Sequence, residues 1–288
     1  MMELGFSITG TALRRRGFNP LSLSPNAFYM PDRADTVFSD ALANVTAQNG
    51  SSVGAVLDIA QGSELGADIW SNPAPALFNY NGSDAQYDQA TQTLSNPAGG
   101  GNAGYPRFNF PVGMTVGRFY RINGQLSGDI GAINLIRAAT GGSTSRLDYD
   151  AATGVISGMV EAQSDALQFS IDGTSFPIIT ITSLTIQEVP GFPAVQHVSG
   201  SRPVFQTDHL TYDLVDDNVT ANLPNLGASA TVAYVTEIGS VITGSQAISG
   251  PTALPVAAKV GPVLYFDRAL SGDETTALNA WLQGHAPS

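Results

Sequence analysis

The sequence has no cysteine, few charged residues and no long apolar run. Without cysteine, the chain forms neither a disulfide framework nor a thiolate metal site. The absence of any apolar run of about 18 residues excludes a membrane-spanning helix. Only 12 Lys and Arg residues stand against 24 Asp and Glu, so the net charge is -12. This balance argues against a nucleic-acid partner, because phosphate backbones bind clusters of basic side chains.

The residues that are abundant indicate a folded β protein. In 288 residues, 43% are hydrophobic, and 31 Gly and 17 Pro supply many tight turns between short strands. Between about Gly62 and Pro190 the apolar residues alternate, which is typical of half-buried strands. The alternating sets are Phe108, Phe110 and Val112; Tyr120, Ile122 and Leu126; and Leu167, Phe169 and Ile171. Further on the apolar phase shifts, which predicts a β-bulge near Thr182 and Ser183.

The last segment of the sequence differs from the rest and predicts a helix. Ser271 and Glu274 fit the S-x-x-E capping box, and Gly284 supplies a stop. Between them, Ala277, Leu278, Trp281 and Leu282 form one apolar stripe. A helix of about a dozen residues is unstable alone in water, so we expect this stripe to pack on a sheet.

Composition divides the chain into three parts. Residues 1–17 form a short arm that ends in Arg14, Arg15 and Arg16. Residues 18–62 and 190–288 share a proline-rich, turn-rich style, and they are predicted to form one discontinuous outer domain. Residues 63–189 are predicted to be a second domain inserted into the first, because insertions are tolerated at exposed turns.

Three stretches carry a resemblance to a known family. They are SLSPNAFYMPDRADTVFSDA, GFPAVQHVSGSRPVFQTDHLTYDLVDDNV and YFDRALSGDETTALNAWL. In order and spacing they resemble bacteriophage virion proteins of the tail-fibre or spike type, which contain a concanavalin A-like, laminin G-like jelly roll. The stretches GSELGADIWSNPAP, FPVGMTVGRFYRINGQLSG and ITSLTIQEVPG resemble an inserted carbohydrate-binding-module-like jelly roll. Leu214 stands where the turn of the family prefers Gly.

The resemblance implies an all-β fold of two jelly-roll or β-sandwich modules, one inserted in the other, with a short C-terminal helix. It implies a non-enzymatic structural protein on the surface of the phage particle, in a tail fibre, a spike or a head decoration, that binds host surface polysaccharide. We expect a homotrimer that attaches to other virion proteins through its N-terminal arm. The alternatives are a polysaccharide depolymerase of the virion and a purely structural protein that binds only virion subunits.

Motifs for catalysis and cofactors lack the context that their chemistry needs. The glycines at 99, 101 and 104 match G-x-G-x-x-G, but no helix start follows to hold a pyrophosphate. The G-x-S-x-G at residues 50–54 lacks the strand and helix of a nucleophile elbow. Asp148 and Asp150 alternate as glycosidase carboxylates do, yet their surroundings favour a turn. We therefore predict no enzyme activity and no cofactor.

One acidic cluster was considered as a metal site. It holds the densest group of oxygen ligands in the sequence, which comprises Asp208, His209, Asp213, Asp216, Asp217 and Asn218. The cluster lacks the spacing and the central Gly of an EF-hand loop. Asp and Asn commonly cap β-turns, so a capped turn is the favoured interpretation and no metal is predicted.

A mixture of aromatic and polar residues indicates where a sugar would bind. Aromatic rings stack on sugar faces, while amides and charged groups bind hydroxyl pairs. The residues proposed to contact a glycan are Trp70, Asn72, Tyr80, Tyr105 and Arg107. Trp70 fits the role of a core anchor equally well. Recognition is therefore assigned to residues 63–189, and attachment and stability are assigned to the outer domain.

Overall fold

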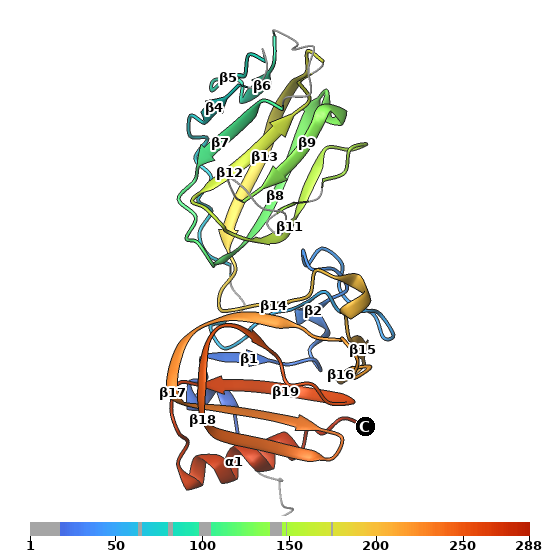
Figure 1. Cartoon of the computed structure of the whole chain (residues 1–288), viewed down its shortest axis with the longest axis vertical. Coiled ribbons are helices and arrows are strands. Elements are labelled where there is room, and N and C mark those ends of the chain that lie inside the picture. The colour runs from blue at the N-terminus through green and yellow to red at the C-terminus, as the bar shows by residue number, and fades with distance from the viewer. Residues whose placement is uncertain are drawn as a thin grey trace, which may run out of the picture.

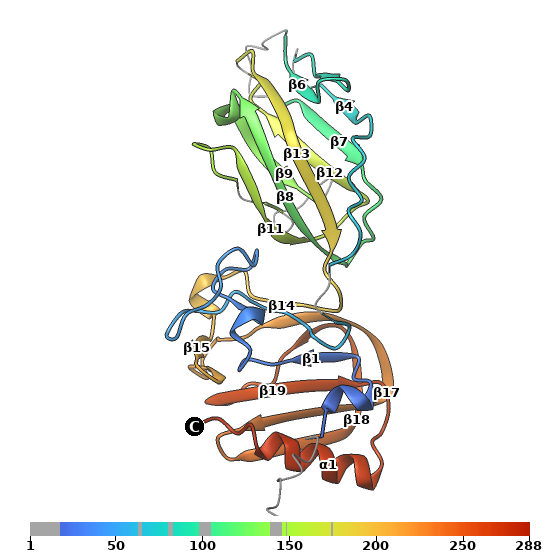
Figure 2. The same cartoon turned by 180° about the vertical axis from the view of Figure 1, so that it is seen from behind.

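A computed structural model describes residues 18–62, 65–79, 83–97, 105–138, 146, 147, 149–173 and 175–288. Strands dominate these residues, and the single α-helix among them lies near the C-terminus, which confirms the all-β class. The predicted arm, residues 1–17, lies outside the described residues. In Figures 1 and 2 the strands form two bodies, which we call the outer module (residues 18–62 and 190–288) and the inner module (residues 65–189).

The outer module is built on a nine-stranded antiparallel sheet in the described part of the chain. The strand order is β15-β16-β19-β17-β14-β3-β2, with β1 paired to β19 and β18 paired to β17. The strands are β1 (Ala27–Tyr29), β2 (Val37–Phe38), β3 (Ala55–Val56), β14 (Ala194–Val195), β15 (Val204–Gln206), β16 (His209–Thr211), β17 (Thr220–Thr236), β18 (Gly239–Ala253) and β19 (Lys259–Phe266). Segments from both ends of the sequence therefore share one sheet.

The inner module consists of two five-stranded sheets. The first has the order β10 (Arg146–Leu147), β9 (Ile133–Arg137), β12 (Ala166–Ile171), β7 (Arg107–Pro111) and β4 (Ala76–Phe78). The second has the order β11 (Val155–Glu161), β8 (Phe119–Gly128), β13 (Ile178–Glu188), β6 (Thr93–Ser95) and β5 (Gln86–Asp88). The inward side chains of both sheets meet in one hydrophobic core, as in a β-sandwich.

The alternating apolar residues of the sequence form this core. Phe108 and Phe110 of β7 pack with Leu167 and Phe169 of β12, and all four are fully buried. The register of β13 against β8 shifts between Ile181 and Ser183, so the predicted bulge is confirmed. The bulge lets the apolar residues on either side of it face the same core.

Short 3-10 helices connect the strands, and the predicted C-terminal helix covers the outer sheet. The 3-10 helices are η1 (Pro20–Leu23), η2 (Ala34–Thr36), η3 (Ile130–Ala132) and η4 (Ser199–Ser201), and the α-helix is α1 (Gly272–Gln283). Both hydrogen bonds of the capping box between Ser271 and Glu274 are present. Leu278 and Leu282 are fully buried against β17 and β19, and Trp281 meets Phe28 edge to face. Docking on a sheet is thereby confirmed.

A buried carboxylate holds together the two segments of the outer module that flank the inner module in the sequence. Asp58, only 3% exposed, accepts hydrogen bonds from the backbone N–H groups of Phe28 and Ala60 at 2.8 Å and of Phe192 at 3.0 Å. Gly191 has a φ of +75°, and a Cβ there would lie 2.3 Å from Asp58 Oδ2, so only glycine fits. Burial raises the pKa of Asp58 to about 6, although its three N–H donors favour the charged form.

The two modules also share a hydrophobic cluster. Phe38 and Ala55 of the outer module pack with Phe119 and Met159 of the inner module, and all are buried. Beside this cluster, the N–H of Met159 donates to the carbonyl oxygen of Leu42 at 2.5 Å. Because both modules contribute side chains to one buried cluster, their contact stabilises a fixed arrangement.

Candidate functional site

The structure separates the residues predicted to bind a glycan into two places. Trp70 lies along the side of the inner module, partly buried against its core. Its ring meets Phe110 edge to face, with 5.3 Å between the ring centroids, and the backbone N–H of Trp70 donates to Asp68 Oδ1 at 3.0 Å. These contacts give Trp70 the role of a core anchor rather than that of an exposed stacking platform.

Asn72 lies close to Trp70 in the sequence and fastens the same segment to β5. Its Nδ2 donates to the carbonyl oxygen of Gln89 at 2.9 Å, and Gln89 Nε2 donates back to the carbonyl oxygen of Asn72 at 2.9 Å. The hydroxyl of Tyr87 donates to Asn72 Oδ1, and burial raises the pKa of Tyr87 to about 12. The Asn72 side chain is thus engaged in holding the protein together.

The beginnings of β7 and β13 lie at the end of the inner module farthest from the outer module, which we call the distal end (Figure 1). Arg107 is the first residue of β7, and Tyr105 stands two residues before it. Strand β13 runs from this end to the junction, and its 11 residues span about 33 Å. At the distal end, the N–H of Ile171 donates to the carbonyl oxygen of Pro106 at 3.1 Å, which joins two of the loops. Tyr80 lies outside the described residues.

Several apolar side chains are exposed at the distal end, beyond those that the sequence indicated. Tyr105 is 43% exposed, Phe78 is 45% exposed and pairs in register with Arg107, and Phe176 and Ile178 are 66% and 59% exposed. Ile178 had a sequence signal, because it is out of phase with the inward residues of β13. Phe78 had none, since its exposure follows from the position of β4 at the edge of a sheet.

A buried side chain fixes the loops of the distal end from within. Asn96 is fully buried, and its Oδ1 accepts a hydrogen bond from the N–H of Asp84 at 2.9 Å. Its Nδ2 lies 3.3 and 3.4 Å from the carbonyl oxygens of Gly173 and Ser175. Asp129 adds a hydrogen bond of 2.9 Å from the N–H of Ile178. These hydrogen bonds hold the backbone on either side of Phe176 in place.

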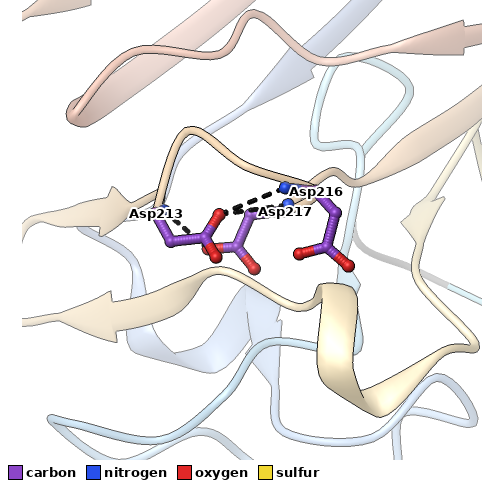
Figure 3. Close-up of side chains that lie close together, drawn as sticks. All are labelled: Asp213, Asp216 and Asp217. Atoms are coloured by element: carbon purple, nitrogen blue, oxygen red, sulfur yellow. Dashed lines mark hydrogen bonds between the residues drawn. The ribbon is translucent and has the colours of Figure 1, made fainter.

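The acidic cluster forms a capped turn, as Figure 3 shows. Asp213 Oδ1 accepts hydrogen bonds from the N–H groups of Val215, Asp216 and Asp217, and Asp217 Oδ2 accepts one from the N–H of Asp213. The hydrogen bond from Val215 contributes most to lowering the pKa of Asp213. Carboxylate oxygens of the three aspartates lie within 4.8 Å of one another, close enough for a cation. Their hydrogen bonds give these oxygens a structural role, and we assign no metal.

Asn218 of that cluster belongs to the turn, because its Nδ2 donates to the carbonyl oxygen of Asp216 at 2.9 Å, whereas Asp208 and His209 lie apart from it. Asp208 Oδ1 is 2.5 Å from Nδ1 of the buried His209, at the start of β16, and neither residue joins the three-aspartate group. Asp150, considered for glycoside hydrolysis, accepts hydrogen bonds from Ala152 and Thr153 and caps a turn. Asp148 lies outside the described residues.

An open cleft of about 420 Å³ lies between the modules. Phe119 and Glu161 line it from the inner module, and His197 and Asn222 line it from the outer module. Asn222 Nδ2 donates to Glu161 Oε1 at 3.3 Å across the cleft. Desolvation and the nearby Arg202 lower the pKa of His197. Polar groups of both modules line the cleft. Its aromatic residue, Phe119, is only 4% exposed and therefore offers no surface on which a sugar could stack.

Comparison with protein families, with curated proteins and with solved structures found no match to this chain. No helix among the described residues is long and apolar enough to cross a membrane.

Proposed function

We propose that this chain is a non-enzymatic structural protein on the surface of a bacteriophage particle, in a tail fibre, a spike or a head decoration. In this proposal the outer module attaches the chain to other virion proteins, and the inner module binds host surface polysaccharide. The order and spacing of the three family-like stretches support the virion assignment. The all-β architecture agrees with it, because jelly rolls and sandwiches occur in capsid and lectin domains.

The observation that carries the recognition role is the distal end. Tyr105, Phe78 and Phe176 expose their rings there. The backbone on either side of Phe176 is held by hydrogen bonds to Asn96 and Asp129. Binding sites are commonly made of loops placed by a rigid scaffold, and aromatic rings give large contact areas at low entropic cost. A sugar face stacked on these rings, with Arg107 beside them, is the interaction we propose.

The test measures binding of the full chain to purified polysaccharide from the surface of the host. Tyr105→Ala together with Phe176→Ala removes two rings, each worth about 1 kcal/mol of stacking. We expect the affinity to fall about 30-fold, with no change in melting temperature, because both side chains face solvent. The matched control is Val116→Ala, which changes a side chain that is 66% exposed at the other end of the module. Equal binding by the double variant and the control would refute the assignment of the distal end.

The same preparation distinguishes the two alternatives. Release of new reducing ends from the polysaccharide would identify a depolymerase. If the unaltered chain fails to bind any host polysaccharide but is incorporated into particles, the purely structural role is correct.

A further inference from the structure

Hydrogen bonds join three loops on one side of the outer module. Ser201 Oγ donates to Asp216 Oδ2 at 2.8 Å, and the N–H of Asn218 donates to the carbonyl oxygen of Ser201 at 3.0 Å. Arg202 connects the third loop, because its guanidinium donates to the carbonyl oxygen of Ser39 at 3.1 Å. Segments 39–45, 198–202 and 213–218 are therefore held together.

These loops expose aliphatic side chains. Val45, Val198 and Leu214 are 58%, 62% and 60% exposed, and Val215 is 85% exposed. We call these four residues the side surface. Single exposed aliphatic residues are ordinary, but a partner that covered all four would remove their exposed apolar surface from water, which favours binding.

The side surface is also rigid. Asp40 caps the first loop by accepting hydrogen bonds from the N–H groups of Leu42, Asn44 and Val45, and Asp213 caps the third loop in the same way. Leu214 has a φ of +62°, in the left-handed region that a leucine rarely adopts. Backbone strain of this kind clusters at functional sites.

The charge next to the side surface defines what can cover it. Asp213, Asp216 and Asp217 place carboxylate oxygens within 4.8 Å of one another beside Leu214 and Val215. The same surface of a second copy would bring like charges together. The complementary ligand therefore combines apolar residues with several adjacent positive charges.

The chain itself contains such a segment in residues 1–17. The apolar residues Leu4, Phe6, Ile8 and Leu13 precede Arg14, Arg15 and Arg16. No other two basic residues are adjacent in the sequence. Phe18, which follows this segment, packs with the α1 cluster, at the opposite end of the outer module from η4 and the side surface (Figure 1).

We propose that residues 4–16 of one copy bind the side surface of a neighbouring copy. The three arginines face Asp213, Asp216 and Asp217, and the apolar residues of the segment cover Val198, Leu214 and Val215. This contact joins two different surfaces, so repeated contacts close into a ring when the rotation between copies allows it. The inference concerns assembly and does not depend on polysaccharide binding.

The absence of cysteine permits a direct test with full-length chains. One chain carries Leu13→Cys and a second carries Val215→Cys. After the two chains are mixed and mildly oxidised, we expect a disulfide-linked heterodimer at a yield at least fivefold above that of Leu13→Cys mixed with Val116→Cys. Val116 is a suitable control because it is 66% exposed and lies in the inner module. Equal yields in the two mixtures would overturn the proposal.

Two further variants separate the remaining outcomes. If a chain with both Leu13→Cys and Val215→Cys closes a disulfide within one copy while the mixture does not cross-link, the segment binds its own chain and the proposal is wrong. Changing Arg14, Arg15 and Arg16 together to Glu should abolish cross-linking and lower the mass in sedimentation. Unchanged cross-linking would contradict the role of charge. Polysaccharide binding by each variant is expected to equal that of the unaltered chain, which keeps this test separate from the proposed recognition role.

Discussion

The change Asp58→Asn tests the role of this buried side chain in the outer module, because it removes a titrating carboxyl group. The pKa of Asp58 rises from an ordinary 3.8 to about 6 in the folded chain, since burial disfavours the charged form. A raised pKa means that the folded state binds the proton more tightly than the unfolded state does. The stability contributed by this group is therefore complete below pH 3.8 and is lost as the pH rises through about 6.

The size of the effect follows from the two pKa values. Each pKa unit corresponds to about 1.4 kcal/mol, so the whole shift corresponds to about 3 kcal/mol, of which the unaltered chain should lose about 2.4 kcal/mol relative to Asp58→Asn between pH 4 and pH 7. The asparagine also places an NH₂ group or an oxygen against the N–H of Phe192. This replacement changes the unfolding free energy by an amount that does not vary with pH.

Urea unfolding between pH 4 and pH 7.5 measures the unfolding free energies of the unaltered chain and of Asp58→Asn. In a background with Trp70→Phe, Trp281 of α1 reports on the outer module alone. The unfolding free energy of the unaltered chain minus that of Asp58→Asn should fall as the pH rises from 4 to about 6 and then level off. A difference constant to within about 0.5 kcal/mol would show that Asp58 does not titrate as a buried carboxyl group, and the reasoning would be refuted.

Three further changes probe other parts of the fold. Ser271→Ala removes the N-cap of α1 and should cost about 1 kcal/mol, measured by thermal unfolding; a change below about 0.3 kcal/mol would contradict the role of the capping box. Met159→Ala leaves a cavity in the cluster between the modules and should cost about 2 to 4 kcal/mol in urea unfolding, whereas a loss below about 1 kcal/mol would show a loosely packed contact. Leu214→Gly relieves a left-handed leucine and should leave stability unchanged or raise it by up to about 1 kcal/mol; clear destabilisation by the same assay would count against backbone strain there.

Local patterns in the sequence were sufficient to predict the C-terminal helix and the strands β7, β8, β12 and β13. The capping box at Ser271, the apolar stripe of α1 and the bulge beside Ser183 depend on neighbours within a few residues. Alternation correctly indicated which side chains of β7 and β12 face the core. These features follow from helix and strand geometry, which fixes the period of buried positions.

Features that depend on distant segments were not visible in the sequence. Asp58 is one acid among many until folding brings Phe28 and Phe192 to its oxygens. Composition placed Trp70 and Tyr105 in one candidate site, but the first packs on Phe110 and the second lies at the distal end. Exposure of an apolar residue depends on which strands form the edges of a sheet, and that is a property of topology.

The central claim is that the distal end of the inner module recognises the host, and adsorption of phage particles tests it most directly. Particles are prepared with the full chain carrying Tyr105→Ala and Phe176→Ala, and others with the control Val116→Ala. Incorporation into particles is measured first, so that loss of the protein is not mistaken for loss of binding. Our account predicts normal incorporation of both chains and adsorption to host cells that is at least tenfold slower for the double variant. Equal adsorption by the two kinds of particle would contradict it.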